Sequence, residues 1–235
     1  MLYELSVSQF KQSLSERTCK IVSRFGRVFI DRAYIMIFEF CWLLYLFFGE
    51  FQPFTIFQFI LFTGLRIGEC LGLTWDCIDF ENNTVTIRDN LSYAYDEWYI
   101  STTKTEGSER VIKLSNYTRN LLLIHKEHQD KSKEVVCKAW KHPDIVFTSS
   151  IGNYFVRTYV NKYLKKLCEE NGLPPVSVHK LRHSNASLLI NSGAALKAVS
   201  DRLGHCNIAI TADIYGHIFD SYEARMAQSL EADLL

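Results

Sequence analysis

The sequence shows no excess of charge of either sign and no regular spacing of cysteines. Its 235 residues include 26 Lys and Arg against 26 Asp and Glu, so net charge by itself points neither to nucleic acid nor to membranes. The seven cysteines lie far apart, without a CxxC pair or a zinc-ligand spacing. We therefore expect free thiols, mostly in the core, in a reducing cytoplasm, and neither a disulfide framework nor a metal site.

A secretory signal and a membrane span are not expected either. The first twenty residues, MLYELSVSQFKQSLSERTCK, lack an apolar stretch flanked by basic residues, which a cleavable signal peptide needs. Residues 33–48 form an apolar run interrupted by Glu39, but a span needs about 20 apolar residues, and a carboxylate in its middle is costly in lipid. We expect buried helices in this region, with membrane association as an alternative that recovery without detergent would exclude.

The sequence does contain enough apolar surface for a folded core. Apolar residues make up 48% of the chain, which at this length predicts one large or two small globular domains. Positive charge gathers in the middle third, because 15 Lys and Arg but only 8 Asp and Glu lie between Ser101 and Arg182. Such a stretch is either a solvated basic face or a surface that contacts phosphates.

The order of periodic segments predicts an α+β fold. Helical spacing gives way after LRIGECLGL to the alternating segments TVTIRDN, LSYAYDEWYI and ERVIKL, and the rest is mostly helical. We predict a mostly helical domain with a small antiparallel three-stranded sheet, with Lys104 at or near a hairpin tip and a short strand at IVF. The predicted helices are 9–20, 31–48, 53–62, 65–73, one that starts near residue 116, 154–171, 179–192, 195–203, 207–216 and 220–230.

Several polar side chains occur where helix or strand formation does not require them: Arg66, Lys104, His179, Arg182, His205 and Tyr215. His179 and Arg182 are three residues apart, so a helix places them on one face. We expect His183, one position further on, to point elsewhere, into a structural hydrogen bond or a separate phosphate contact. Taken singly, each residue has a structural alternative, such as an ion pair between Arg66 and Glu69 or a histidine hydrogen-bonded within the core.

As a set, these side chains suit phosphate chemistry. Two arginines, a lysine, two histidines and a tyrosine, without a carboxylate cluster, are a poor set for glycoside hydrolysis or metal binding. Guanidinium groups bind phosphoryl oxygens bidentately and stabilise the charge that develops at a five-coordinate phosphorus. A tyrosine can act as the nucleophile and conserve the bond energy in a covalent intermediate.

Four longer segments contain these residues: TGLRIGECLGLTWDCIDFENNTVTI, TTKTEGSERVIKL, HKLRHSNASLLINSG and LGHCNIAITADIYGH. Their order and intervals resemble the catalytic motifs of the tyrosine recombinases, the phage and transposon integrase family. The resemblance covers about residues 60–220 and implies a fold like that of the tyrosine recombinase catalytic domain. It also implies a function, site-specific DNA recombination by strand cleavage and rejoining, without a metal or another cofactor.

The resemblance assigns the nucleophile and the phosphate clamp. Tyr215 would attack a scissile DNA phosphate, form a 3′-phosphotyrosyl link and release a 5′-hydroxyl. Arg66 and Arg182 would hold the non-bridging oxygens of that phosphate.

The other three residues receive proton-transfer and binding roles from the same resemblance. Lys104 would protonate the departing 5′-oxygen, and His179 would act as a general base toward the tyrosine hydroxyl. His205 would donate a hydrogen bond to the phosphate. Glu69 and His217 match common family positions, and we expect them to orient and pack.

The resemblance also implies partners. They are double-stranded DNA, further copies of the chain in a tetramer on that DNA, and an accessory DNA-bending or excision factor, with no membrane partner and a cytoplasmic location. Residues 221–235 would form a helical tail that docks on a neighbouring protomer or packs on its own chain, and both alternatives stay open.

The N-terminal region departs from the family pattern. We expect residues 1–52 to be an atypical aromatic-rich segment, the remnant of a truncated N-terminal region, and residues 53–220 to be the catalytic domain. About sixty residues precede TGLR, fewer than a helical DNA-clamping domain needs. Two alternatives follow: a truncated remnant that binds DNA in a salt-sensitive way without recombining it, and a type IB topoisomerase that relaxes supercoils without site preference.

Overall fold

The computed structural model describes residues 51–102, 109–170 and 174–205. The chain divides into two compact units, residues 1–49 and 50–235, and all described residues belong to the second. Several predictions concern residues outside the described ranges. They are the helices 9–20, 31–48, 207–216 and 220–230, the tail 221–235 and all but the last two residues of segment 1–52. The described elements are α3 (Phe51–Thr63), α4 (Ile67–Leu71), η1 (Trp75–Cys77), β1 (Ile78–Asp79), β2 (Thr84–Ile87), β3 (Asp89–Ala94), β4 (Glu97–Thr102), β5 (Arg110–Lys113), α5 (Asn116–Val136), η2 (Cys137–Ala139), α6 (Arg157–Glu170), α7 (Val178–Asn191) and α8 (Leu196–Leu203).

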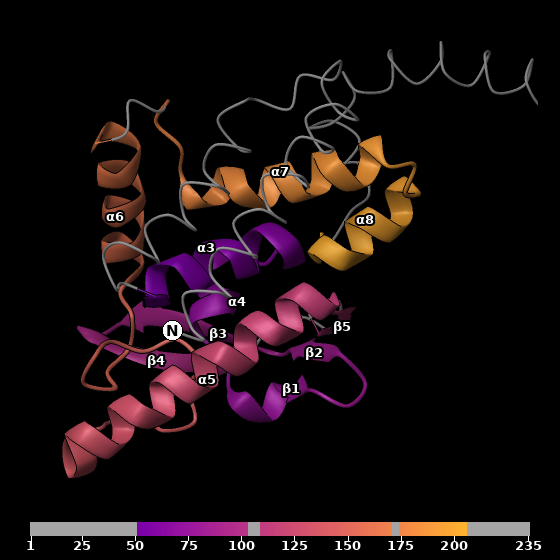
Figure 1. Ribbon diagram of the computed structural model, residues 1–235. Helices are drawn as coiled ribbons and strands as arrows, with labels where there is room; N and C mark the ends of the chain where they lie inside the picture. Colours follow the sequence, from indigo (N-terminus) through magenta and orange to yellow (C-terminus); the bar gives the residue numbers. More distant parts are fainter. Residues whose placement is uncertain (1–50, 103–108, 171–173, 206–235) are drawn as a thin grey trace, which may run out of the picture. The chain divides into compact units, whose positions relative to one another are not determined.

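Helix α3 is the centre of the described core. Its sequence, FQPFTIFQFILFT, is apolar on most sides, as is typical of a helix surrounded by other elements. It lies between α7 and α5 (Figure 1), and Ile56, Phe59 and Ile60 are fully buried. The predicted helix 53–62 is confirmed, with Pro53 in the first turn, where its missing N–H removes no helical hydrogen bond.

The end of α3 brings the chain close to α7 and α8. Gly64 has φ +74°, and its N–H donates to the Ile60 carbonyl at 2.8 Å. A Cβ at this position would lie 2.7 Å from both Asn185 Oδ1 and Leu203 Cδ2, so glycine is required both by the backbone angle and by the space. The close approach places the following segment, which begins α4, beside the C-terminal end of α8.

The strands form two small antiparallel sheets. The three-stranded sheet has the order β1–β2–β5, and Val85 on β2 pairs with Ile112 on β5. Both side chains are buried, so this face of the sheet belongs to the core. The predicted strands TVTIRDN and ERVIKL are confirmed as β2 and β5, which pair with each other.

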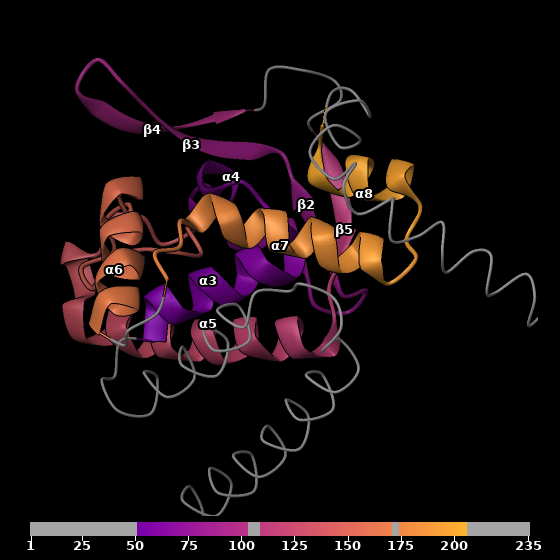
Figure 2. The same ribbon diagram turned by 90° about the horizontal axis from the view of Figure 1, so that it is seen from above.

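The predicted strand LSYAYDEWYI is wrong, because this segment is a hairpin of two strands. The chain reverses at Tyr95 and Asp96, whose φ angles are +53° and +61°, and β3 pairs with β4 as a separate two-stranded sheet. Two left-handed residues in a two-residue loop match the twist of a hairpin. Figure 2 shows the hairpin extending beyond α4.

The hairpin prediction for Lys104 concerns a segment outside the described residues. Residues 103–108 join β4 to β5, and these strands belong to different sheets. The predicted short strand IVF is a single bridge, in which Ile145 pairs with Thr74.

The remaining predicted helices are confirmed with small shifts of their ends. α5 begins after Ser115, whose hydroxyl accepts from the Thr118 N–H, and α6, α7 and α8 cover most of 154–171, 179–192 and 195–203. Among the cysteines in the described ranges, three are buried free thiols, as expected, and Cys137 is exposed. No helix in the described part of the chain is long and apolar enough to cross a bilayer, and the run 33–48 lies outside that part.

Candidate phosphate-binding site

Three arginines converge on the C-terminal end of α8. Arg110 Nε donates to the Arg202 carbonyl at 2.8 Å, and Arg182 Nη2 donates to the Leu203 carbonyl at 2.7 Å. Arg66 Nη2 donates to the next carbonyl, that of Gly204, at 2.9 Å. The last carbonyls of a helix have no partner within the helix and carry its partial negative charge. The backbone of α8 therefore fixes three cationic side chains that come from different parts of the sequence.

Arg66 stands at the N-terminus of α4 and leaves part of its guanidinium in solvent. Its side chain is 45% exposed, and its Nη1 donates to Glu69 Oε1 at 2.8 Å. The Arg66 backbone N–H donates to Glu69 Oε2 at 2.9 Å. The ion pair named as the structural alternative is thus present, and it leaves the guanidinium accessible to an anion.

Glu69 is buried between Arg66 and Arg110. The Arg110 guanidinium donates to both carboxylate oxygens, at 2.8 Å from Nη2 and 3.2 Å from Nη1. Burial by itself raises the pKa of Glu69, but the hydrogen bonds and positive charges of Arg110 and Arg66 outweigh it and lower the pKa below its ordinary value. Glu69 is therefore ionised at neutral pH and holds both arginines in place, as expected of an orienting residue.

Arg182 lies on α7 with its side chain buried. Its Nη1 donates to the Gly64 carbonyl and its Nη2 to the Leu203 carbonyl, both at 2.7 Å. The guanidinium thus ties the end of α3 to the end of α8. This charge is buried among backbone oxygens, which keeps its position fixed.

The expectation that His183 points away from His179 is wrong. The two rings are T-shaped with centroids 4.5 Å apart, because residues four apart on a helix are neighbours just as residues three apart are. Burial and then the positive charges of Arg182 and Arg66 lower the pKa of His179. Burial, His179 and Arg182 lower the pKa of His183, so the surroundings favour the neutral form of both rings.

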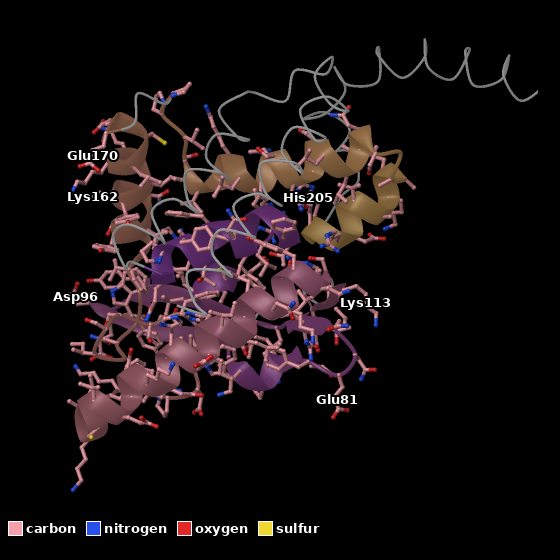
Figure 3. All side chains as sticks on the ribbon, viewed as in Figure 1. Glu81, Asp96, Lys113, Lys162, Glu170 and His205 are labelled. Carbon is pink, nitrogen blue, oxygen red and sulfur yellow. The ribbon has the colours of Figure 1, made fainter. Side chains whose placement is uncertain are left out.

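His205 follows Gly204 directly and is labelled at the end of α8 in Figure 3. Burial, followed by the charges of Arg182, Arg66, His183 and Arg110, lowers its pKa to about 4. The three arginines among these groups donate to the carbonyls of residues 202–204, directly before His205. A neutral imidazole there can donate one hydrogen bond to a phosphate oxygen.

Four of the six predicted site residues are described. Arg66 and Arg182 donate to the carbonyls of Gly204 and Leu203, directly before His205, and His179 lies three residues before Arg182 on α7. Lys104 and Tyr215 lie outside the described residues, so their positions stay predictions. Within those residues, no group of three or more His, Cys, Asp or Glu side chains is arranged to hold a metal ion.

Sequence reasoning missed Arg110, which belongs to this cluster. The alternation of β5 contained a signal for it. Arg110 and Ile112 are two residues apart and share the face that is buried, whereas Val111 between them is 64% exposed. A charged residue on the buried face of a strand is rare unless it is paired.

Solved structures of the same fold are integrases and recombinases. The Tn1549 transposon integrase in complex with transposon right end DNA matches with a TM-score of 0.70 at 24% identity, over 81% of this chain and 62% of that one. The XerA recombinase matches with a TM-score of 0.62 at 18% identity, over 82% and 60%. The described unit has the fold of a tyrosine recombinase catalytic domain, and the predicted fold class is confirmed.

Sequence comparison agrees with the fold. Residues 51–221 match the phage integrase family. The chain is 33% identical over 191 residues to a tyrosine recombinase XerC-like protein of Caldanaerobacter subterraneus subsp. tengcongensis, covering 75% of this chain and 48% of the relative. It is 30% identical over 185 residues to the ICEBs1 integrase of Bacillus subtilis, covering 77% and 49%. This chain belongs to the phage integrase family, and it spans about half the length of these relatives.

Proposed function

We propose that this chain carries the catalytic domain of a site-specific recombinase that cleaves and rejoins double-stranded DNA through a 3′-phosphotyrosyl intermediate. One observation carries the proposal. Arg66 and Arg182 donate to adjacent carbonyls, those of Gly204 and Leu203, immediately before His205. Two guanidinium groups and a neutral imidazole next to each other form a site for one phosphate.

The proposed cleavage step forms one bond and breaks another. The Tyr215 oxygen attacks the phosphorus, a P–O bond to tyrosine forms, and the bond between phosphorus and the 5′-oxygen breaks. The tyrosine proton passes to His179, and Lys104 supplies a proton to the 5′-oxygen. Rejoining is the reverse reaction, in which the 5′-hydroxyl attacks the phosphotyrosine, so the intermediate conserves the bond energy.

The electrostatics of the described residues support these roles. Burial and the charges of Arg182 and Arg66 lower the pKa of His179. This favours the neutral imidazole, which can accept a proton. Arg66 and Arg182 supply fixed positive charge toward the phosphate oxygens, which gain negative charge as the phosphorus becomes five-coordinate.

The proposal extends to partners and domain organisation. DNA as the partner is supported by the Tn1549 integrase, which was solved with DNA, and by relatives that are named as integrases and transposases. We further propose that the chain acts as a tetramer with an accessory DNA-bending or excision factor, in the cytoplasm. In this proposal residues 53–220 form the catalytic domain and residues 221–235 a tail.

The test is covalent capture on a suicide duplex drawn from the DNA that flanks the gene. A nick close to the crossover point lets a short fragment diffuse away after cleavage, so the phosphotyrosyl adduct accumulates. Wild type is expected to form an adduct stable to denaturation, Tyr215→Phe to form none, and Tyr95→Phe, which changes a fully exposed tyrosine, to behave as wild type.

Three results would count against the proposal. DNA binding without an adduct would favour a chain that binds but does not recombine. An adduct that persists in Tyr215→Phe would reject the nucleophile. Relaxation of supercoiled plasmid without any site preference would favour a topoisomerase.

A further inference from the structure

We infer that Arg110 is a positioning residue for DNA cleavage, which sets the orientation of Arg66 through Glu69 and the position of His205 through the end of α8. This inference rests on the proposed function. Arg110 belongs to none of the roles proposed above, and it contacts two of the elements that carry them.

The first link runs from Arg110 to Arg66. Each oxygen of Glu69 accepts from both arginines: Oε1 from Arg66 Nη1 and Arg110 Nη1, and Oε2 from the Arg66 backbone N–H and Arg110 Nη2. The Glu69 side chain is 3% exposed and that of Arg110 is 8% exposed. A two-pronged guanidinium fixes the plane of a carboxylate, so Arg110 determines the direction in which Glu69 presents its oxygens to Arg66.

The second link runs from Arg110 to the end of α8. Its Nε donates to the Arg202 carbonyl at 2.8 Å, and His205 lies only three residues further along the chain. Gly204, between them, has φ +67°. A Cβ on Gly204 would lie 2.8 Å from Arg110 Nη1 and 3.0 Å from its Cζ, so the guanidinium lies directly against the backbone that leads to His205.

The geometry explains why another cation would not be equivalent. Arg110 uses Nη1 and Nη2 for Glu69 and Nε for the Arg202 carbonyl, and the planar fork holds these three donors at fixed angles. A lysine retains the charge but presents a single nitrogen. We therefore expect Arg110→Lys to keep the fold and to position Arg66 poorly.

The experiment compares cleavage of a suicide duplex whose scissile group is either a phosphodiester or an uncharged methylphosphonate. A cation positioned to neutralise the phosphate is needed less on the uncharged substrate. Arg110→Gln is expected to slow phosphodiester cleavage by about 10²-fold with little change in DNA affinity, and to slow methylphosphonate cleavage much less. Arg110→Lys should fall between Arg110→Gln and wild type.

Two controls separate positioning from stability. Arg119→Gln removes a half-buried arginine whose Nε donates to the Phe80 carbonyl, and it should cleave both substrates as wild type does. The double variant Glu69→Gln/Arg110→Gln removes both charges of the buried pair. Its unfolding temperature should lie above that of Arg110→Gln, whereas its cleavage of the phosphodiester should remain slow.

A glycine pair tests the second link. In Gly204→Ala, the added Cβ pushes against the Arg110 guanidinium. Gly193 has φ +91°, and an added Cβ there would meet nothing within 4 Å, so Gly193→Ala introduces backbone strain without a contact. Only Gly204→Ala should slow cleavage.

Failure of this inference is distinct from failure of the proposed function. No adduct with wild type would reject both. If wild type is active, three results would reject the inference alone. Arg110→Gln could cleave as fast as Arg119→Gln, Arg110→Gln could slow cleavage of both substrates equally, or the double variant could recover cleavage.

Discussion

His179 and His183 lie one turn apart on α7 with their rings at 88° and the ring centroids 4.5 Å apart. A proton on one ring disfavours a proton on the other, and this effect of His179 follows burial among the causes that lower the pKa of His183. Arg182 lowers the pKa of both rings, so the charge of this arginine acts on the two histidines together.

Substitution of Arg66 should raise the pKa of His179. Arg66 is one of the two positive charges that lower this pKa, after burial, so its removal favours the imidazolium. NMR titration of the His179 ring in wild type should give a pKa below 6.5, and Arg66→Gln should move it upward. Arg119→Gln should leave it unchanged. A wild-type value at or above 6.5 would contradict the assignment.

His125 should make the protein lose stability in mild acid. Burial lowers its pKa to about 4, and its Nε2–H donates to the Val146 carbonyl at 2.7 Å. The unfolded chain binds the proton more tightly, so the free energy of unfolding falls as pH drops from the ordinary value of 6.5 toward 4, by about 2 kcal/mol between pH 7 and pH 5.

Urea unfolding of wild type and His125→Gln at pH 7 and pH 5 measures this effect. The other histidines remain in both proteins, so the difference between the two pH dependences reports His125. Equal pH dependences in the two proteins would show that His125 does not contribute.

The errors made from the sequence have definite physical causes. The long helices could be predicted because their apolar residues recur with a helical period, as in α5 and α6. The hairpin at Tyr95 and Asp96 was missed because two-residue loops of this kind usually have Gly after Asn or Asp, and here the loop contains no glycine. Convergence of Arg66 with Arg182 and His205 could not be predicted from local periodicity, since Arg66 is far from the other two in the chain. The family resemblance indicated it.

Glu69 should be required for stability. Glu69→Gln leaves the buried guanidinium of Arg110 without its counter-charge, and removal of one partner of a buried pair costs about 3–5 kcal/mol. Because the pKa of Glu69 is lowered in the folded state, its contribution is present above the ordinary value of 4.5 and is lost as pH falls through the lowered value. Urea unfolding at pH 7 should show the loss.

A matched carboxylate provides the control. Glu127 forms an exposed ion pair with Lys131 at 2.7 Å, and such pairs contribute about 0–1 kcal/mol. If Glu127→Gln and Glu69→Gln lowered the free energy of unfolding equally, burial of the Glu69 pair would have no energetic role.

Tyr95→Asn should stabilise the hairpin. Tyr95 is 100% exposed and holds φ at +53°, where an ordinary side chain costs roughly 1–2 kcal/mol and asparagine less. The free energy of unfolding should rise by up to about 1 kcal/mol. Tyr93→Asn, which removes a ring 4.8 Å from that of Trp98, should lower it. A loss of stability in Tyr95→Asn would mean that its ring makes contacts in solution.

The lysines of α6 should contribute to DNA binding. Lys165 and Lys166 lie 3.6 Å from Glu169 and Glu170, and exposed pairs of this kind are weak enough for a phosphate to replace the carboxylate. Figure 3 labels Lys162 on the same helix. Each lysine that contacts a phosphate should contribute about 0.9 to the slope of log Kobs against log salt.

The triple change of these lysines to Gln should therefore reduce that slope, measured by fluorescence anisotropy on a labelled duplex. Lys131→Gln/Lys197→Gln removes charge from exposed ion pairs on α5 and α8 and serves as the comparison. A slope unchanged in the triple variant would place the DNA elsewhere.

The carbonyls at the end of α8 have a consequence for the entropy of the proposed DNA binding. A free arginine side chain has about 2 kcal/mol of rotamer entropy to lose when it is fixed on a ligand. Arg182 is already fixed by the Gly64 and Leu203 carbonyls, so this loss occurs when the chain folds. In the proposed function, this side chain would meet DNA in one conformation, and more of the interaction energy with the phosphate would be available to the transition state.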